Sequence, residues 1–360
     1  MNYPLVLFAG GSVVSFLLCG LVKYLPLLDA PDGGRKQQAA PVPRTGGLGI
    51  LLTVCIIVAI GAAVHGLFRE DGSSFWRVAG AVALVITPFL IGFADDWFGL
   101  RALTKLGLLL VWAIAAASPF FLSGTFMGGV TGILAIGWLI VITNATNFMD
   151  GSNGLAIGSS GLMVLGLFPL FAVSMMCWVA CRPDHVGGLA LLTQFAFFGA
   201  VVGFLFWNMQ GVLYAGDCGS LGAGGLFGLM GLYLVSASME GLRAALFSLT
   251  LCLPFLVDVL LTLAWRSLKR RNLLVAHTDH AYQRLRAKGW GHVKAALVWW
   301  GMTVVCMVAA TFTLFFEMQV RGGGQAAYVP LLQAGVLAGL TGLGLGLWLW
   351  ERSRPISKRG

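Results

Sequence analysis

The chain has 360 residues, of which 58% are hydrophobic and only 10% are charged, and its mean hydropathy is +0.87. Because a soluble domain carries about 25% charged residues, this composition excludes an ordinary soluble protein and predicts an integral membrane protein. The net charge of +9 does not call for nucleic acid as a partner, because the distribution of Lys and Arg over the loops accounts for it.

Eleven apolar segments are each long enough to cross a bilayer, at about 20 residues per crossing. We therefore expect an all-α, polytopic integral membrane protein with about 11 transmembrane helices. With no separate soluble domain and no obvious repeat, residues 1–360 are predicted to form a single multi-pass domain. The predicted spans lie at residues 4–23, 47–67, 77–93, 105–121, 130–146, 157–180, 189–206, 221–237, 244–265, 295–316 and 329–350.

The loops indicate the orientation of these spans. With the N-terminus outside, the inner loops and the C-terminal tail carry 18 of the 23 Lys and Arg residues, and the outer loops carry five. Since inner loops are enriched in Lys and Arg, the pattern predicts a periplasmic N-terminus and a cytoplasmic C-terminus. Five polar stretches then share the cytoplasmic face: 24–46, 94–105, 144–158, 207–222 and 266–294. A charged face on a membrane scaffold favours an enzyme with a soluble phosphorylated substrate and a lipid substrate.

Asp95 and Asp96 end the third predicted span. Two adjacent carboxylates repel each other and resist burial, so they need a cation, a basic partner or water. They favour metal coordination or deprotonation of a phosphate, and a solvated helix cap is the alternative. Lys105 opens the next span, where it can reach a lipid phosphate or extend to the membrane surface.

Asn144, Asn147 and Asp150 follow at intervals of three residues, which places them on one face if the fifth helix continues. Such a row can bind a nucleotide base, a sugar amide or a metal, and capping of the helix end is the alternative. In the fourth stretch, Asp217 lies between Gly216 and Gly219 and precedes Ser220. This pattern suits Mg²⁺ with a diphosphate held by backbone amides, and a turn with Ser220 as N-cap is the alternative.

The last stretch is the most basic one. His280 and Arg284 lie four residues apart, which gives a cationic stripe suited to a diphosphate or simply a solvated basic loop. Too few ligands lie near the pair His277 and His280 for zinc. Asp258 falls in the middle of the ninth predicted span, where a carboxylate either functions or pairs with a neighbouring helix.

The order of these motifs resembles the polyprenyl-phosphate N-acetylhexosamine-1-phosphate transferases (glycosyltransferase family 4 type). This family includes phospho-MurNAc-pentapeptide translocase and the initiating transferases of O-antigen and teichoic-acid synthesis. The resemblance runs from about Asp29 to Gly289. It rests on Asp29, Pro31, Arg35, Lys36, Pro43, Gly46, Gly47, Asp95, Asp96, Lys105, Asn144, Asn147, Asp150, Gly151, Gly216, Asp217, Gly219, Ser220 and the late His loop.

The resemblance implies transfer of a HexNAc-1-phosphate from a UDP-N-acetylhexosamine to undecaprenyl phosphate, with release of UMP, at the cytoplasmic face of a bacterial inner membrane. It implies Mg²⁺, or Mn²⁺ in its place, as the cofactor. It makes Asp95, Asp96 and Asp217 catalytic, and it makes Asp217 and Asp150 the metal ligands. The substrate-binding residues that it implies are Asn144, Asn147, Asp150, Lys105, Gly216, Ser220, His280, Arg284, Arg35 and Lys36.

Two departures from the family pattern are informative. The family commonly has Asp-Gly-x-Asp-Gly, and here Asn153 replaces the second Asp. The late loop commonly reads His-x-His-His, and here Tyr282 and Gln283 replace the last two His residues. This form resembles the surface-polysaccharide initiators that use UDP-GlcNAc or a 6-deoxy relative.

The peptidoglycan translocase is the alternative within the class. A secondary transporter is the alternative outside it, although only Asp258 lies clearly mid-span. The glycine-rich spans are compatible with a homodimer.

Overall fold

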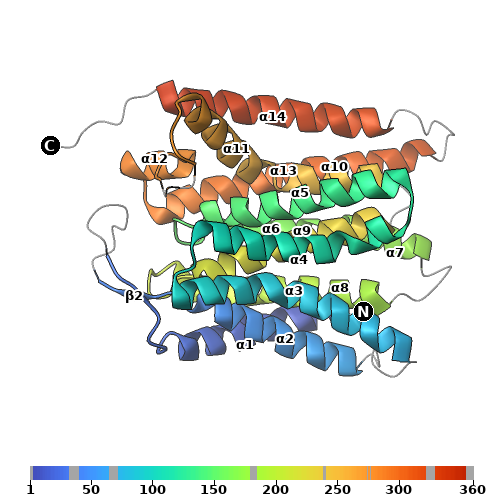
Figure 1. Ribbon diagram of the computed structural model, residues 1–360, viewed down its shortest axis with the longest axis horizontal. Helices are drawn as coiled ribbons and strands as arrows, with labels where there is room; N and C mark the ends of the chain where they lie inside the picture. The colour runs from blue at the N-terminus through green and yellow to red at the C-terminus, as the bar shows by residue number, and fades with distance from the viewer. Residues whose placement is uncertain are drawn as a thin grey trace.

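The computed structural model describes residues 3–31, 40–64, 72–178, 185–237, 241–273, 275, 277–321 and 329–353. Long helices that run side by side along one direction form a single bundle (Figure 1). The helices are α1 (Tyr3–Val22), α2 (Gly46–Val64), α3 (Gly72–Phe98), α4 (Ala102–Leu122), α5 (Phe126–Phe148), α6 (Leu155–Gly166), α7 (Phe168–Trp178), α8 (His185–Asn208), α9 (Gly216–Ala237), α10 (Gly241–Leu251), α11 (Leu253–Leu268), α12 (Ala281–Ala287), α13 (His292–Arg321) and α14 (Val329–Ser353). Strands β1 (Leu28–Asp29) and β2 (Val42–Pro43) pair antiparallel.

The described part of the chain contains ten segments that are long and apolar enough to cross a membrane, or 11 if one bent helix pair counts as a span. The expectation of an all-α chain with about 11 spans is therefore confirmed. The bent pair is α10 and α11, whose axes differ by 75°. The span predicted over residues 244–265 corresponds to this pair, and the bend falls where Pro254 occupies the first turn of α11 and favours the start of a new helix.

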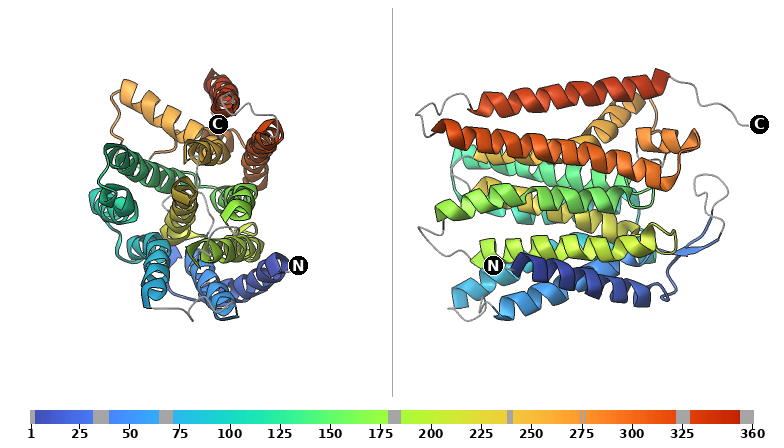
Figure 2. Two further views of the ribbon diagram at one scale, coloured as in Figure 1. Left: turned by 90° about the vertical axis from the view of Figure 1, so that its right-hand side faces the viewer. Right: turned by 180° about the vertical axis from the view of Figure 1, so that it is seen from behind.

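Helix α9 lies in the middle of the bundle, surrounded by the other helices (Figure 2, left). Its glycines make this position possible. An added Cβ at Gly222 would lie 2.2 Å from the ring of Phe89, and one at Gly225 would lie 2.5 Å from Pro88. Small residues let membrane helices approach closely, and this is what the glycines of α9 do. In α14, four glycines have no described neighbour within 4 Å of an added Cβ: Gly335, Gly339, Gly342 and Gly346.

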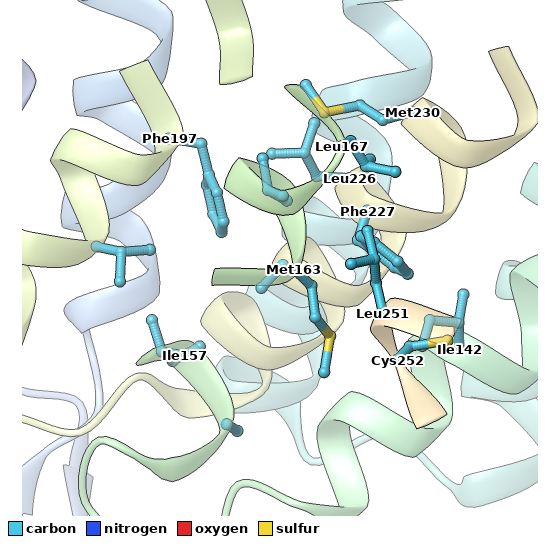
Figure 3. Close-up of a cluster of buried hydrophobic side chains, with 14 of the residues drawn as sticks. Ile142, Ile157, Met163, Leu167, Phe197, Leu226, Phe227, Met230, Leu251 and Cys252 are labelled. Atoms are coloured by element: carbon cyan, nitrogen blue, oxygen red, sulfur yellow. The ribbon is translucent and has the colours of Figure 1, made fainter. Parts of the chain in front are cut away.

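The apolar core gathers around α9. Figure 3 shows Leu226, Phe227 and Met230 of α9 facing side chains from neighbouring helices, among them Met163 and Phe197. These residues are almost fully buried. The same packing fixes the polar N-terminus of α9, which carries Asp217, at one end of the bundle.

The short elements β1, β2 and α12 lie at that end, which we call the α12 end (Figure 1). The predicted polar stretches meet there. The backbone N–H of Gly46 donates to the carbonyl of Tyr214 over 2.9 Å, which joins the first stretch to the fourth. Side chains join the second, third and fifth stretches to these, as described below. Contacts between described residues therefore join parts of all five stretches at the α12 end.

Candidate active site

Asp95 and Asp96 lie in the last turn of α3, and Asp217 lies in the first turn of α9. The two helix ends approach closely because Gly216 has a left-handed backbone (φ 69°) and no side chain. A Cβ at Gly216 would lie 2.5 Å from Oδ2 of Asp96. Three carboxylates from two distant parts of the sequence are thereby brought together, as the resemblance implied for the catalytic residues.

Lys105, in the first turn of α4, joins two of these carboxylates. Its Nζ lies 2.7 Å from Oδ2 of Asp95 and 2.6 Å from Oδ2 of Asp217. Asp95 also accepts the backbone N–H of Leu100 through Oδ1 over 2.7 Å. The side chain of Asp217 is 30% exposed, so the cluster opens to the outside at this point. One positive charge thus lies between two negative ones, at a place that water and a substrate can reach.

Asp96 has a different environment, because its side chain is only 2% exposed. Its Oδ2 accepts the backbone N–H of Cys218 over 2.9 Å. Arg44 lies 3.7 Å from its Oδ1 and donates to its backbone carbonyl over 2.6 Å. Asp96 therefore fixes the backbone directly after Asp217, which makes it a support for that residue.

Asn147 contributes from the end of α5. Its Nδ2 donates to Oδ1 of Asp217 over 3.0 Å and to Oγ of Ser220 over 2.9 Å. Ser220 donates to the carbonyl of Gly216 and lies inside α9, so a role as N-cap is excluded. Asn144 lies one turn earlier and donates to the carbonyl of Ile140 within its own helix. The structure therefore joins Asn147 and Ser220 directly to Asp217.

Asp150 is not on the same helix as Asn144 and Asn147, contrary to expectation. Helix α5 ends at Phe148, and its capping residue Met149 is followed by Asp150 in the turn to α6. Burial, together with the negative charges of Asp217 and Asp96, raises the pKa of Asp150 well above its ordinary value. Asp150 thus lies within electrostatic reach of the cluster, and a bound cation would favour its ionised form.

Asp258 does not face the membrane lipid. It is 97% buried at α11 and accepts the backbone N–H of Ala281 over 2.8 Å, so it satisfies the N-terminus of α12. Arg284, expected in a cationic stripe, instead pairs with Glu351 of α14 over 2.7 Å. His280 is buried and stacks on Phe148, with ring centroids 5.9 Å apart. Arg284 and His280 therefore do not form an exposed stripe, because their side chains contact α14 and α5 instead.

Arg35 and Lys36 lie outside the described residues.

The sequence did not predict a cavity at the α12 end. A cavity of about 540 Å³ has Asn153, Tyr214 and His292 in its lining. Tyr214 comes three residues before Asp217, and this spacing was the available signal. His292 gave no signal, since only folding brings the start of α13 against Asn153, whose backbone N–H donates to Nδ1 of His292 over 3.2 Å.

The oxygen atoms of this cluster fit Mg²⁺ better than other metals. Mg²⁺ is commonly held by one or two carboxylates, with substrate phosphates completing its shell. Asp217 and Asp150 offer carboxylates, and Asn147 uses its Nδ2 in the hydrogen bonds described, which leaves its amide oxygen for a cation. In the described part of the chain, no three His, Cys, Asp or Glu side chains form a complete metal site.

At one end of the membrane bundle, carboxylates, a lysine and an amide gather in a set that can bind a phosphorylated substrate. Comparison with known proteins indicates which class of protein has such a site. Residues 78–235 match Glycosyl transferase family 4, and this segment contains all of Asp95, Asp96, Lys105, Asn147 and Asp217. Over this segment the chain is similar to that family, and over most of its length it is similar to polyprenyl-phosphate N-acetylglucosamine-1-phosphate transferases, which indicates an enzyme of this kind.

Its relatives match over most of their length. Decaprenyl-phosphate N-acetylglucosaminephosphotransferase of Mycobacterium leprae is 28% identical, over 89% of each chain. A probable undecaprenyl-phosphate N-acetylglucosaminyl 1-phosphate transferase of Bacillus subtilis is 24% identical, over 92% of this chain and 87% of the relative. Phospho-N-acetylmuramoyl-pentapeptide-transferase of Micrococcus luteus is 26% identical, over 84% of this chain and 90% of the relative. The chain is thus similar to both branches of the family that the motifs indicate.

Proposed function

We propose that the protein transfers a HexNAc-1-phosphate from UDP-GlcNAc, or a 6-deoxy relative of it, to undecaprenyl phosphate. UMP leaves, and the lipid-linked sugar diphosphate begins an O-antigen or another surface polysaccharide. The observation that carries the proposal is the position of Lys105, whose amine lies between Asp95 and Asp217. Such a site can bind a phosphate through the amine and a divalent cation through the carboxylates. The 18 basic residues assigned to the inner side support a site that faces the cytoplasm.

In the reaction, an oxygen of the lipid phosphate attacks the β-phosphorus of the UDP-sugar, and the bond from that phosphorus to the bridging oxygen of UMP breaks. Asp95 accepts a proton from the lipid phosphate or, together with Lys105, orients it. Asp96 supports Asp217 through the Cys218 N–H. Asp217, Asp150 and the amide oxygen of Asn147 would hold Mg²⁺, which when bound offsets negative charge on the diphosphate.

The cavity lined by Asn153 and Tyr214 supports a place for the uridine of the donor. A phenol ring offers a surface for base stacking, and an amide offers both a donor and an acceptor to the edge of a pyrimidine. Both residues are three positions from an acid of the cluster, Asp150 or Asp217, so a nucleoside in the cavity would extend its diphosphate toward them. An aspartate at position 153 would keep an acceptor, so the proposed contact tolerates either residue.

The deciding experiment is UMP release by purified protein in detergent with undecaprenyl phosphate and Mg²⁺. The donors are UDP-GlcNAc, UDP-GalNAc, a 6-deoxy UDP-sugar and UDP-MurNAc-pentapeptide, each offered alone. We expect release that requires both lipid and Mg²⁺ with UDP-GlcNAc or the 6-deoxy donor. Release with UDP-MurNAc-pentapeptide alone would instead assign the peptidoglycan reaction. No release with any donor, from protein that unfolds cooperatively, would refute the proposal.

A further inference from the structure

Tyr282 is among the largest fully buried side chains of the described chain, although it comes from the most basic of the predicted polar stretches. It lies on α12 and packs edge-on against Trp299 of α13, with ring centroids 6.1 Å apart. Its hydroxyl leaves this apolar surrounding and donates to the carbonyl of Phe148 over 3.0 Å. Phe148 is the last residue of α5, so the hydroxyl satisfies a carbonyl that the helix itself leaves without a partner.

The same hydroxyl touches a second point on that turn. A Cβ added to Gly151 would lie only 2.3 Å from Oη of Tyr282, so the backbone there rests directly on the phenol oxygen. Phe148 and Gly151 flank Met149 and Asp150 on either side. One side chain therefore contacts both ends of the short segment that carries Asp150.

Helix α12 is itself held firmly, which lets Tyr282 act as a fixed support. At its N-terminus, Asp258 accepts the backbone N–H of Ala281 over 2.8 Å. At its C-terminus, Glu351 of α14 accepts from Nε of Arg284 over 2.7 Å and from Nζ of Lys288 over 2.6 Å. Glu351 is 3% exposed, and breaking a buried ion pair is costly, so these contacts resist movement of α12.

The hydroxyl also keeps its proton. Burial, and then the negative charges of Asp150 and Asp258, raise the pKa of Tyr282 above its ordinary value. Tyr282 is therefore a hydrogen-bond donor over the whole range of pH in which the protein would work. This is the form that the carbonyl of Phe148 requires.

We infer that Tyr282 is a positioning residue, whose hydroxyl fixes the Phe148–Gly151 turn and thereby sets the Asp150 carboxylate for the divalent cation. The inference rests on the proposed function, in which Asp150 helps to hold that cation. It also accounts for Tyr282 where the family pattern commonly has His. A tyrosine carries its donor on a longer side chain, and here that length reaches from α12 to the end of α5.

The test is Tyr282→Phe, which removes only the hydroxyl and keeps the buried ring. We would measure binding of Mn²⁺ alone by the loss of its free electron paramagnetic resonance signal, which needs neither substrate nor turnover. Losing one hydrogen bond predicts roughly fivefold weaker Mn²⁺ binding. In turnover, kcat should fall by a similar factor while the KM for the UDP-sugar changes little. Tyr24→Phe is the matched control, since Tyr24 is 78% exposed, and it should bind Mn²⁺ like the wild type.

A second variant keeps the inference testable by rescue. In Gly151→Ala the new methyl group collides with the phenol oxygen, so Mn²⁺ binding should fall more strongly than in Tyr282→Phe. The double variant should recover part of that loss, because without Oη the nearest ring atom, Cζ, lies 3.2 Å from the added Cβ. Strictly additive losses would overturn the inference, as would wild-type Mn²⁺ binding by Tyr282→Phe.

These outcomes separate the inference from the proposed function. If the wild type releases UMP and Tyr282→Phe binds Mn²⁺ normally, only the positioning role fails. If the wild type transfers no sugar phosphate while Tyr282→Phe weakens Mn²⁺ binding and rescues Gly151→Ala, the proposed reaction fails and the positioning role stands.

Discussion

Replacement of Asp217 by Asn is the sharpest test of the carboxylate cluster. The side chain keeps its volume, and its single amide oxygen can still accept from one of the two donors, Lys105 or Asn147, which contact different oxygens of Asp217. The variant loses an attraction to Lys105 and a repulsion from Asp95, whose Oδ2 lies at most about 5 Å away because both oxygens contact one Nζ. At an effective dielectric constant of about 20, the attraction over 2.6 Å contributes about 6 kcal/mol and the repulsion over about 5 Å costs about 3 kcal/mol.

The two contributions partly cancel, and solvent screens the remainder because the Asp217 side chain is 30% exposed, so the free energy of unfolding should fall by no more than about 3 kcal/mol. Catalysis should respond very differently, because the variant removes a negative charge from the proposed cation site. We expect UMP release to fall by about a thousandfold or more, with a thermal unfolding midpoint within a few degrees of the wild type. Asp71→Asn makes the same chemical change in a stretch predicted on the other side of the membrane and should stay active. Turnover like that of the wild type in Asp217→Asn would refute the metal assignment.

Three further predictions concern other parts of the α12 end. Asn153→Asp should keep UMP release within about threefold of the wild type, because an acceptor remains, while Asn153→Ala should raise the KM for the UDP-sugar about tenfold; equal effects would remove Asn153 from the nucleoside pocket. Asp258→Ala should lower the free energy of unfolding by about 2 kcal/mol, because the N–H of Ala281 loses its acceptor, while Asp258→Asn should lose less than half as much. Arg270→Gly should raise the thermal midpoint, by about 1 kcal/mol in stability, because Arg270 has φ 52° directly after α11; a lower midpoint would show that its side chain outweighs the backbone strain.

Sequence patterns predicted the membrane spans well, because hydropathy over about 20 residues is a local property. They did not predict the size of the bend between α10 and α11, where a continuous apolar run turns by 75°. Hydropathy is the same for a straight and a bent segment, so only Pro254 gave a signal. The ending of α5 at Phe148 was also missed, since the spacing of Asn144, Asn147 and Asp150 is equally compatible with a longer helix.

In the candidate site, too, the sequence identified single residues but not the contacts between them. Asp95, Lys105 and Asp217 were identifiable one by one as polar residues at the ends of apolar runs. The joining of both carboxylates by one amine could not be predicted, because Lys105 and Asp217 are 112 positions apart. Arg284 shows the opposite error. Its charge suggested a ligand site, but Glu351 lies 67 positions further on and pairs with it in the folded chain.

By itself, the sequence determined that the chain is a helical membrane protein whose polar residues gather in a few loops, because apolar runs of this length are stable only as helices in lipid. Its motifs also indicated the family of transferases. The tertiary structure decided which of these polar residues work together. Close packing of α9 through its glycines brings Asp217 to Asp95, Asp96 and Lys105. Asp258, Arg284 and Tyr282 instead hold α12 against its neighbours. Such contacts depend on how helices far apart in the chain pack against each other, and no local pattern of residues carries that information.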